Sequence, residues 1–320
     1  MLRYQWAGHF FHLNLAMQKR LLPPASLDMD PIWIFGLWRS GTTALHELLM
    51  ADRKFCAPRT WQCMAPSSFA ITGRPSHSTQ LDRPMDDMVI ATDSPQEDEF
   101  AWLMLGGHSV YRGFLDPRRL TTLEWLLNPD AWDEQATWIA EAMWRDFLGQ
   151  VVAQDEQRRR LILKSPNHSF RAPALLRRFP NSDIVWITRS PAEIVQSNLK
   201  MWPSMINIYG LAGTPNGVLE HFIESALRQA ARSLTRLRAT LSRRELVVVR
   251  QQDLRASPGE VRDSLLRHWH VSATAKHAAE LPSRAIKSSS GASLVLNTAW
   301  QEAIQLLNSA QEAALDSHGL

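Results

Sequence analysis

Three basic residues follow three short apolar segments of the sequence. Arg39, Lys164 and Arg189 each stand at or just after such a segment, the first of which is Ile32 to Phe35. Apolar runs of this length predict buried strands, and ligands of parallel sheets bind at the carboxyl ends of the strands. We therefore expect the three cations to converge on one crevice, where they would bind an anionic ligand.

The segment around Arg39 has the layout of an anion-binding loop. A predicted strand at 32–35 is followed by Gly36 to Gly41, and an apolar-periodic helix follows Thr42 and Thr43. A strand, a glycine-bounded turn and a helix direct backbone N–H groups and the positive end of a helix dipole at an anion. The spacing is that of a P-loop, but Thr42 stands where the triphosphate-binding motif has Lys. We expect the loop to hold a phosphate or sulfate group.

Two separated motifs resemble those of sulfotransferases that use 3′-phosphoadenosine 5′-phosphosulfate (PAPS). The run Trp38-Arg39-Ser40-Gly41-Thr42-Thr43 is similar to their 5′-phosphosulfate loop, P-[KR]-S-G-T-T, with Trp38 in place of proline. Arg189, with Ser197 eight residues later in the next predicted helix, resembles their 3′-phosphate site. Lys164-Ser165-Pro166 with His168 resembles the K-S-P-x-H stretch of bacterial members.

The resemblance covers roughly residues 31–260 and implies a fold and a reaction. The fold is a three-layer α/β arrangement with a central, mostly parallel sheet flanked by helices, as in P-loop nucleoside triphosphate hydrolases. The reaction is transfer of the sulfuryl group from PAPS to a hydroxyl or amine of a small-molecule, lipid or sugar acceptor, without a metal. Arg39 and Lys164 would then stabilise negative charge on the leaving phosphate.

The same resemblance assigns the residues that bind the donor. Residues 38–43 would hold the 5′-phosphosulfate, and Arg189 and Ser197 the 3′-phosphate. The Trp38 side chain either stacks on the ligand or fills the turn. Arg284 and Lys287, in a basic segment that ends at a glycine, are secondary candidates for the phosphates, the alternative being a plain linker.

The reaction also needs a group that accepts the acceptor's proton. His168 is our first candidate, because it follows Lys164 closely and titrates near neutrality; its alternative role is a hydrogen bond at the start of a helix. Glu97 and Glu99 come next. The pattern Ser94-Pro95 with Glu97 predicts a helix start with a capping box, which accounts for Glu97 in structural terms and leaves Glu99 less well explained.

Composition narrows the class of protein. The 320 residues are 45% hydrophobic, and the net charge of +3 suits an anionic ligand but is too small to predict nucleic-acid binding. The two cysteines, Cys56 and Cys63, match no zinc-site spacing, and a reduced pair predicts a cytoplasmic protein. No apolar stretch approaches the length of a transmembrane helix, and the N-terminal segment, interrupted by polar residues, does not read as a signal peptide.

We expect one domain over residues 1–320. It comprises an N-terminal helix within 1–24, a core at 31–260, and a C-terminal loop and helix at 280–320. The N-terminal helix either packs on the domain or lies at a membrane interface. A homo-oligomer is compatible with the sequence, which gives no further indication of oligomeric state.

Two other functions compete with sulfuryl transfer. A P-loop kinase or nucleotide hydrolase is disfavoured by Thr42 and by the lack of a clear strand ending in Asp that would hold Mg²⁺. A non-catalytic nucleotide-binding module is disfavoured by the retained Arg39, Lys164, Arg189 and Ser197.

Overall fold

The core of the computed structural model is a parallel sheet of five strands. The structure describes residues 2–27, 30–77, 80–82, 89–128, 130–131, 134–157, 159–271 and 298–320. Neighbouring strands pair in the order β2-β5-β1-β6-β7, and every pair is parallel, as predicted. The strands are β1 Ile32–Phe35, β2 Phe55–Cys56, β5 Arg160–Lys164, β6 Asp183–Thr188 and β7 Leu246–Arg250.

Both faces of this sheet are covered, which explains why its strands are continuous apolar runs. Successive side chains of a strand point to opposite faces. In β1, Trp33 and Phe35 join one apolar cluster, whereas Ile32 and Ile34 join the other. All four side chains are fully buried.

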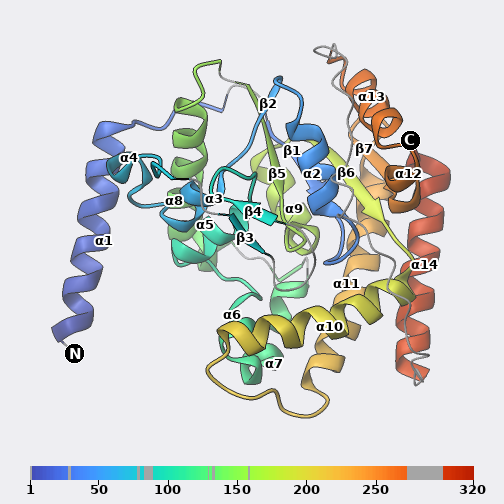
Figure 1. Cartoon of the computed structure of the whole chain (residues 1–320). Coiled ribbons are helices and arrows are strands. Elements are labelled where there is room, and N and C mark those ends of the chain that lie inside the picture. The colour runs from blue at the N-terminus through green and yellow to red at the C-terminus, as the bar shows by residue number, and fades with distance from the viewer. Residues whose placement is uncertain are drawn as a thin grey trace.

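Helices form the two outer layers (Figure 1). The first cluster draws on α8, α9, α10, α11 and α14, and the second on α2, α12 and α13. The helices are α1 Leu2–Leu21, α2 Thr42–Met50, α3 Thr60–Met64, α4 Phe69–Thr72, α5 Asp98–Met104, α6 Arg112–Leu115, α7 Leu120–Leu123, α8 Glu134–Ala153, α9 His168–Arg178, α10 Pro191–Tyr209, α11 Val218–Thr240, α12 Gln251–Ala256, α13 Pro258–His268 and α14 Thr298–His318, with 3₁₀ turns Pro117–Arg119 and Glu124–Leu127. The three-layer prediction is confirmed.

The terminal helices lie on opposite sides of the core (Figure 1). α1 contacts α4, and α14 packs along α11 and against β7. None of the helices in the described ranges is both long enough and apolar enough to cross a membrane. A single domain over residues 1–320 stays a prediction.

The segment between α4 and α5 contains a second, smaller sheet. β3 Gln80–Asp82 pairs with β4 Val89–Ala91 as an antiparallel pair of strands. The two strands are only three residues long, too short for an apolar alternation to reveal them.

Candidate functional site

The loop between β1 and α2 depends on three left-handed backbone positions. Gly36, Arg39 and Gly41 have φ of 142°, 70° and 106°. A Cβ at Gly36 would lie 2.7 Å from Ser40 Oγ and 2.8 Å from the Ile187 carbonyl oxygen, so only glycine fits. Arg39 holds its conformation with a side chain, at a cost of roughly 1 kcal/mol or more. Backbone strain in a loop of this kind is typical of a ligand-binding turn.

The loop is the point where the predicted cations meet. The Arg39 guanidinium donates through Nε to Ser197 Oγ at 2.9 Å, and Arg189 Nη1 donates to the Arg39 carbonyl oxygen at 2.8 Å. Lys164 Nζ lies 3.4 Å from Thr43 Oγ1. Strand order explains this, because β1 lies between β5 and β6 and the three carboxyl ends are adjacent.

A buried hydroxyl of the loop has no hydrogen-bond partner in the described part of the chain. Ser40 is fully buried, and within the described ranges its Oγ has no hydrogen-bond partner. A buried hydroxyl without a partner is rare, and a bound anion would satisfy it. With α2 directing its N-terminal amides toward the same loop, the residues present fit a phosphate or sulfate ligand.

Each residue of the acidic run 97–99 pairs with a different base on the β5–α9 segment. Glu97 Oε1 accepts from Lys164 Nζ at 2.7 Å, His168 Nε2 lies 2.9 Å from both oxygens of Asp98, and Arg171 Nη2 donates to Glu99 Oε2 at 2.6 Å. All six side chains are at least nine-tenths buried. Lys164 ends β5, whereas His168 and Arg171, three residues apart at the start of α9, share one face of that helix. We call these three contacts the acid–base ladder.

The ladder overturns the predicted capping box. α5 begins at Asp98 rather than after Ser94, and Glu97 is its N-cap without a side-chain cap bond. Ser94 instead accepts a hydrogen bond from the Ala91 amide, within a turn. A buried pair with Lys164 satisfies the Glu97 carboxylate better than one helix amide would, and charge-assisted hydrogen bonds are the stronger kind.

Glu97 has two further donors that the sequence reasoning missed. Tyr111 Oη donates to Glu97 Oε2 at 2.7 Å, and Ser165 Oγ lies 3.4 Å from the same oxygen. Burial raises the pKa of the Tyr111 phenol well above its ordinary value, and the Glu97 charge raises that pKa further. The phenol therefore stays protonated and donates. A lone tyrosine 14 residues after a glutamate leaves no pattern that would have revealed this contact.

The other two candidate bases lie inside the core. His168 is fully buried, with its ring edge-on to Trp33 at 5.1 Å between centroids. Glu99 is equally buried, and Asn167 Nδ2 donates to its Oε1 at 2.9 Å. Both side chains are shielded from solvent in the described structure, whereas Glu97 lies beside the loop and is 8% exposed. Which of the three accepts the proton stays a prediction.

Trp38 fills the turn, the second of its two predicted roles. Its indole is buried against Phe170, Trp202 and Phe222, at centroid distances of 5.4 to 6.0 Å. Asn198 Nδ2 donates to its carbonyl oxygen at 3.0 Å. The side chain therefore anchors the loop to α9, α10 and α11. Arg284 and Lys287, by contrast, lie outside the described residues.

Comparison with known proteins decides the family. The sequence profile of the sulfotransferase family matches residues 31–275, well over half of the chain. The chain belongs to the sulfotransferase family. The match includes the loop, the acid–base ladder and the Arg189–Ser197 segment.

Named members of this sulfotransferase family resemble the chain in sequence and in fold. It is 33% identical over 239 residues to omega-hydroxy-beta-dihydromenaquinone-9 sulfotransferase Stf3 of Mycobacterium bovis and of Mycobacterium tuberculosis. That alignment covers 72% of this chain and 61% of Stf3, so the chain spans about three fifths of the length of these curated relatives.

Two solved structures show the fold. Sulfotransferase STF9 of Mycobacterium avium has a TM-score of 0.64 and 18% identity, and covers 97% of this chain and 83% of its own. Sulfotransferase STF1 of Mycobacterium tuberculosis has a TM-score of 0.57 and 18% identity, with 96% and 80% covered. At that identity the similarity concerns architecture alone.

A second buried histidine stands beside the sulfotransferase loop. His46 on α2 is 1% exposed, and neither of its ring nitrogens has a hydrogen-bond partner within the described ranges. Burial lowers the pKa of its imidazole well below the ordinary value, and the positive charges of Lys164 and Arg59 lower it further. His46 is therefore neutral around pH 7. It follows Thr43 by three residues, so the two share a face of α2.

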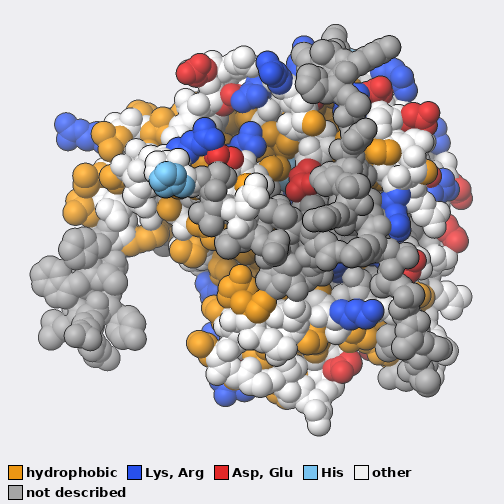
Figure 2. Space-filling view, in the orientation of Figure 1, with side chains coloured by type: hydrophobic (Ala, Val, Ile, Leu, Met, Phe, Trp, Pro, Cys, Tyr) orange, Lys and Arg blue, Asp and Glu red, His pale blue; other side chains and the backbone are white. Residues whose placement is uncertain are grey.

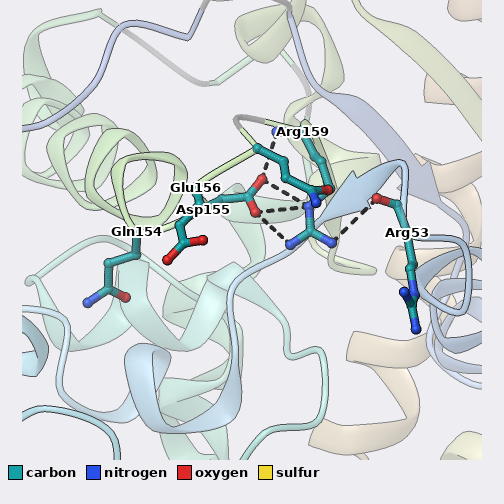
Figure 3. A pocket seen from close by; sticks show the side chains of 6 residues that line it. Arg53, Gln154, Asp155, Glu156 and Arg159 are labelled. Atoms are coloured by element: carbon teal, nitrogen blue, oxygen red, sulfur yellow. Dashed lines mark hydrogen bonds and ion pairs between the residues drawn. The ribbon is translucent and has the colours of Figure 1, made fainter.

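Two surface cavities lie away from this site. One, of about 300 Å³, is lined by Arg53, Gln154 to Gln157 and Arg159, and the Arg159–Asp155 ion pair (2.6 Å) runs along it (Figure 3). Arg159 precedes β5, so this cavity opens at the amino edge of the sheet. Another, of about 410 Å³, includes Asp30 and Phe179, which precede β1 and β6. The cations lie at the opposite edge, where α/β folds bind ligands.

Proposed function

We propose that the chain transfers the sulfuryl group of PAPS to a hydroxyl of a lipid-like acceptor. The observation that carries the proposal is the meeting of Arg39, Lys164 and Arg189 around the β1–α2 loop. Membership of the sulfotransferase family supports the reaction. The name of Stf3, which specifies a hydroxylated menaquinone, supports a long apolar alcohol as acceptor.

The donor phosphates would be held by residues from two parts of the loop edge. Residues 39–43 fit the 5′-phosphosulfate, since this segment has buried Ser40 Oγ, α2 amides and the Arg39 charge. Arg189 and Ser197 would hold the 3′-phosphate; both already contact Arg39, which ties the two subsites together. When bound, PAPS supplies the sulfuryl group.

The chain's own residues would contribute charge and a proton acceptor. Arg39 and Lys164 keep positive charge at the loop, where a preorganised donor stabilises developing negative charge by about 3 kcal/mol. Glu97 would accept the acceptor's hydroxyl proton at its carboxylate, which Tyr111 and Lys164 hold in a fixed orientation. No residue is assigned to a metal.

A cytoplasmic location is part of the same proposal. Cys56 and Cys63 are both buried and unpaired. Burial, with the nearby Asp155 charge, raises the pKa of the Cys56 thiol to about 12, so it stays protonated and unreactive. Unpaired thiols are typical of a reducing compartment.

Nucleotide binding tests the proposal against its two rivals. We expect 3′-phosphoadenosine 5′-phosphate (PAP) to bind in preference to ATP, with or without Mg²⁺. Arg189→Ala should abolish that preference, whereas Arg177→Ala, an exposed arginine of α9, should keep it. Mg²⁺-dependent preference for ATP would favour a P-loop kinase or hydrolase. PAP binding without transfer of label from ³⁵S-labelled PAPS to any polyprenyl alcohol would favour a non-catalytic module.

Glu97→Gln tests the proton acceptor. The variant keeps the size of the side chain but has one acceptor oxygen in place of two, and it cannot take up a proton. We expect its turnover to fall while PAP affinity stays at the wild-type level. Glu312→Gln, which alters an exposed carboxylate of α14, is the control for loss of one negative charge. Wild-type turnover in Glu97→Gln would exclude it as the base.

A further inference from the structure

The N-terminal helix α1 has one face docked on the body of the molecule. Gln18 is fully buried; its Nε2 donates to the Pro66 carbonyl oxygen at 2.6 Å and to Gln150 Oε1 at 2.9 Å. Its Oε1 accepts from the Ala70 amide at 3.0 Å. With Leu15 buried on the same side, these bonds fix the rotation of α1 about its axis.

That rotation leaves an apolar stripe in solvent. Leu13, Met17 and Leu21 are 54%, 45% and 63% exposed, and they follow one another at intervals of four residues. Side chains four apart lie above one another on a helix. α4 packs against α1 and carries Ile71, itself 37% exposed. Figure 2 shows hydrophobic side chains gathered over α1 and α4. We call Leu13, Met17 and Leu21 the α1 stripe.

The charges of α1 are all of one sign. Its twenty residues include no Asp or Glu, but they include Arg3, Lys19 and Arg20. Arg20 is exposed beside Leu21, whereas Lys19 lies on the docked side and pairs with Asp146 while keeping 43% of its side chain in solvent. A long basic side chain beside an apolar stripe can reach the headgroups of a lipid layer while the stripe enters it. An apolar stripe with a neighbouring base is one feature of helices that lie in a membrane interface.

We propose that the α1 stripe docks the chain on an anionic lipid surface, where a membrane-dissolved acceptor is presented to the site. The nature of the acceptor in this proposal rests on the proposed function. The choice of lipid as the partner of the stripe rests on the residues of α1 alone. Lipid fits better than a protein groove because exposed Arg20, beside the stripe, matches anionic headgroups. It also explains why leucines face solvent on a helix whose other face is tightly fixed.

Vesicle sedimentation tests the proposal with the full chain. We expect binding to vesicles of phosphatidylcholine mixed with phosphatidylglycerol, weaker binding to phosphatidylcholine alone, and loss of binding at high salt. Leu13→Glu/Met17→Glu should weaken binding at least about tenfold, since burial of two large apolar side chains is lost. Leu211→Glu/Leu306→Glu, at two exposed leucines elsewhere, is the matched control and should keep wild-type binding. Arg20→Gln should reduce only the dependence on phosphatidylglycerol.

Two results would overturn the proposal. One is wild-type protein that stays in the supernatant with anionic vesicles; the other is equal binding by the stripe variant and the wild type. Light scattering on the same samples recognises another occupant: a wild-type dimer that Leu13→Glu/Met17→Glu converts to monomer, without vesicle binding, makes the stripe an interface between copies. PAP binding separates the two proposals. If the chain binds vesicles but not PAP, only the proposed function is contradicted. If it binds PAP but not vesicles, only the docking proposal is contradicted.

Discussion

The β1–α2 loop and the acid–base ladder meet at Lys164, but they are built in different ways. The loop is a backbone structure: left-handed positions at Gly36, Arg39 and Gly41 shape it, and its ligand groups are amides and short side chains. The ladder is made of side chains alone, and its partners are 67 to 72 residues apart in the chain. A local structure leaves a local pattern in the sequence, and a long-range one does not.

The difference also separates their expected energetics. Removing one partner of a buried ion pair leaves an uncompensated charge and costs about 3–5 kcal/mol of stability. Changing a polar group on the loop leaves ligand binding weaker and the core intact. Variants of the ladder should therefore mainly lower stability, and variants of the loop should mainly lower ligand affinity or turnover. Lys164 belongs to both regions, so its substitution should lower both stability and turnover.

Lys164→Met is the variant with the largest expected effect. We expect turnover to fall about 10²- to 10³-fold, as for loss of a preorganised donor, and stability to fall because Glu97 is left without its cation. Lys164→Met/Glu97→Gln should recover most of the stability and none of the turnover. Urea unfolding and ³⁵S transfer measure the two effects. Recovery of turnover in the double variant would mean that Lys164 acts only through the ladder.

Arg171→Met tests a ladder position away from the loop. Glu99 is then left buried with Asn167 as partner, and we expect a loss of roughly 3 kcal/mol in the free energy of unfolding. PAP affinity should stay at the wild-type level, because Arg171 lies in α9, seven residues after Lys164, and contacts Glu99 rather than the loop. Arg171→Met/Glu99→Gln should restore part of the stability. If Arg171→Met instead lost PAP affinity at unchanged stability, the expected difference between ladder variants and loop variants would be wrong.

Gly36→Ala tests the loop through its backbone. A Cβ there would clash with Ser40 Oγ and with the Ile187 carbonyl oxygen, so we expect weaker PAP binding and a stability loss of about 2 kcal/mol. Gly106→Ala is the matched control: its φ is 91°, but a Cβ there meets no atom within 4 Å. It should show the conformational cost of about 1 kcal/mol alone, with normal PAP binding. Equal effects of the two variants would mean that close approach in the loop does not matter.

The strands, the main helices and the loop were predictable because each is encoded within a dozen residues. The apolar runs at 32–35, 161–163 and 184–187 predict strands. Parallel pairing of these strands then places Arg39, Lys164 and Arg189 close together, without knowledge of any contact. The family resemblance rests on the same local motifs. For Trp38 the sequence left two roles open, stacking on the ligand or filling the turn. Its packing against three aromatic rings favours the second.

The ladder was misread because local rules gave a sufficient but wrong account of Glu97. Ser94, Pro95 and Glu97 satisfy the helix-start pattern, so nothing in that stretch indicated that Glu97 has a distant partner. One signal was present: three consecutive acids, with three bases, Lys164, His168 and Arg171, within eight residues elsewhere in the chain. A match of that kind needs the fold to bring α5 against α9, and tertiary packing cannot be read from either segment alone.

His46 gives the prediction with the smallest expected effect. It lies on α2, and burial together with the charge of Lys164, in the ladder, lowers its pKa. Its folded pKa lies well below the unfolded value of about 6.5, so the unfolded chain binds the extra proton first as pH falls. The neutral form's contribution to stability is complete above pH 6.5 and decreases below it, by at most about 1.4 kcal/mol per pH unit, until the folded pKa is reached. His46→Leu removes this dependence and both unpartnered nitrogens. We expect its stability, relative to wild type, to rise between pH 6.5 and pH 5 in urea titrations. A difference between the two proteins that stays constant over this range would show that His46 has the same pKa in the folded and the unfolded chain, as expected if it lies at a site open to water.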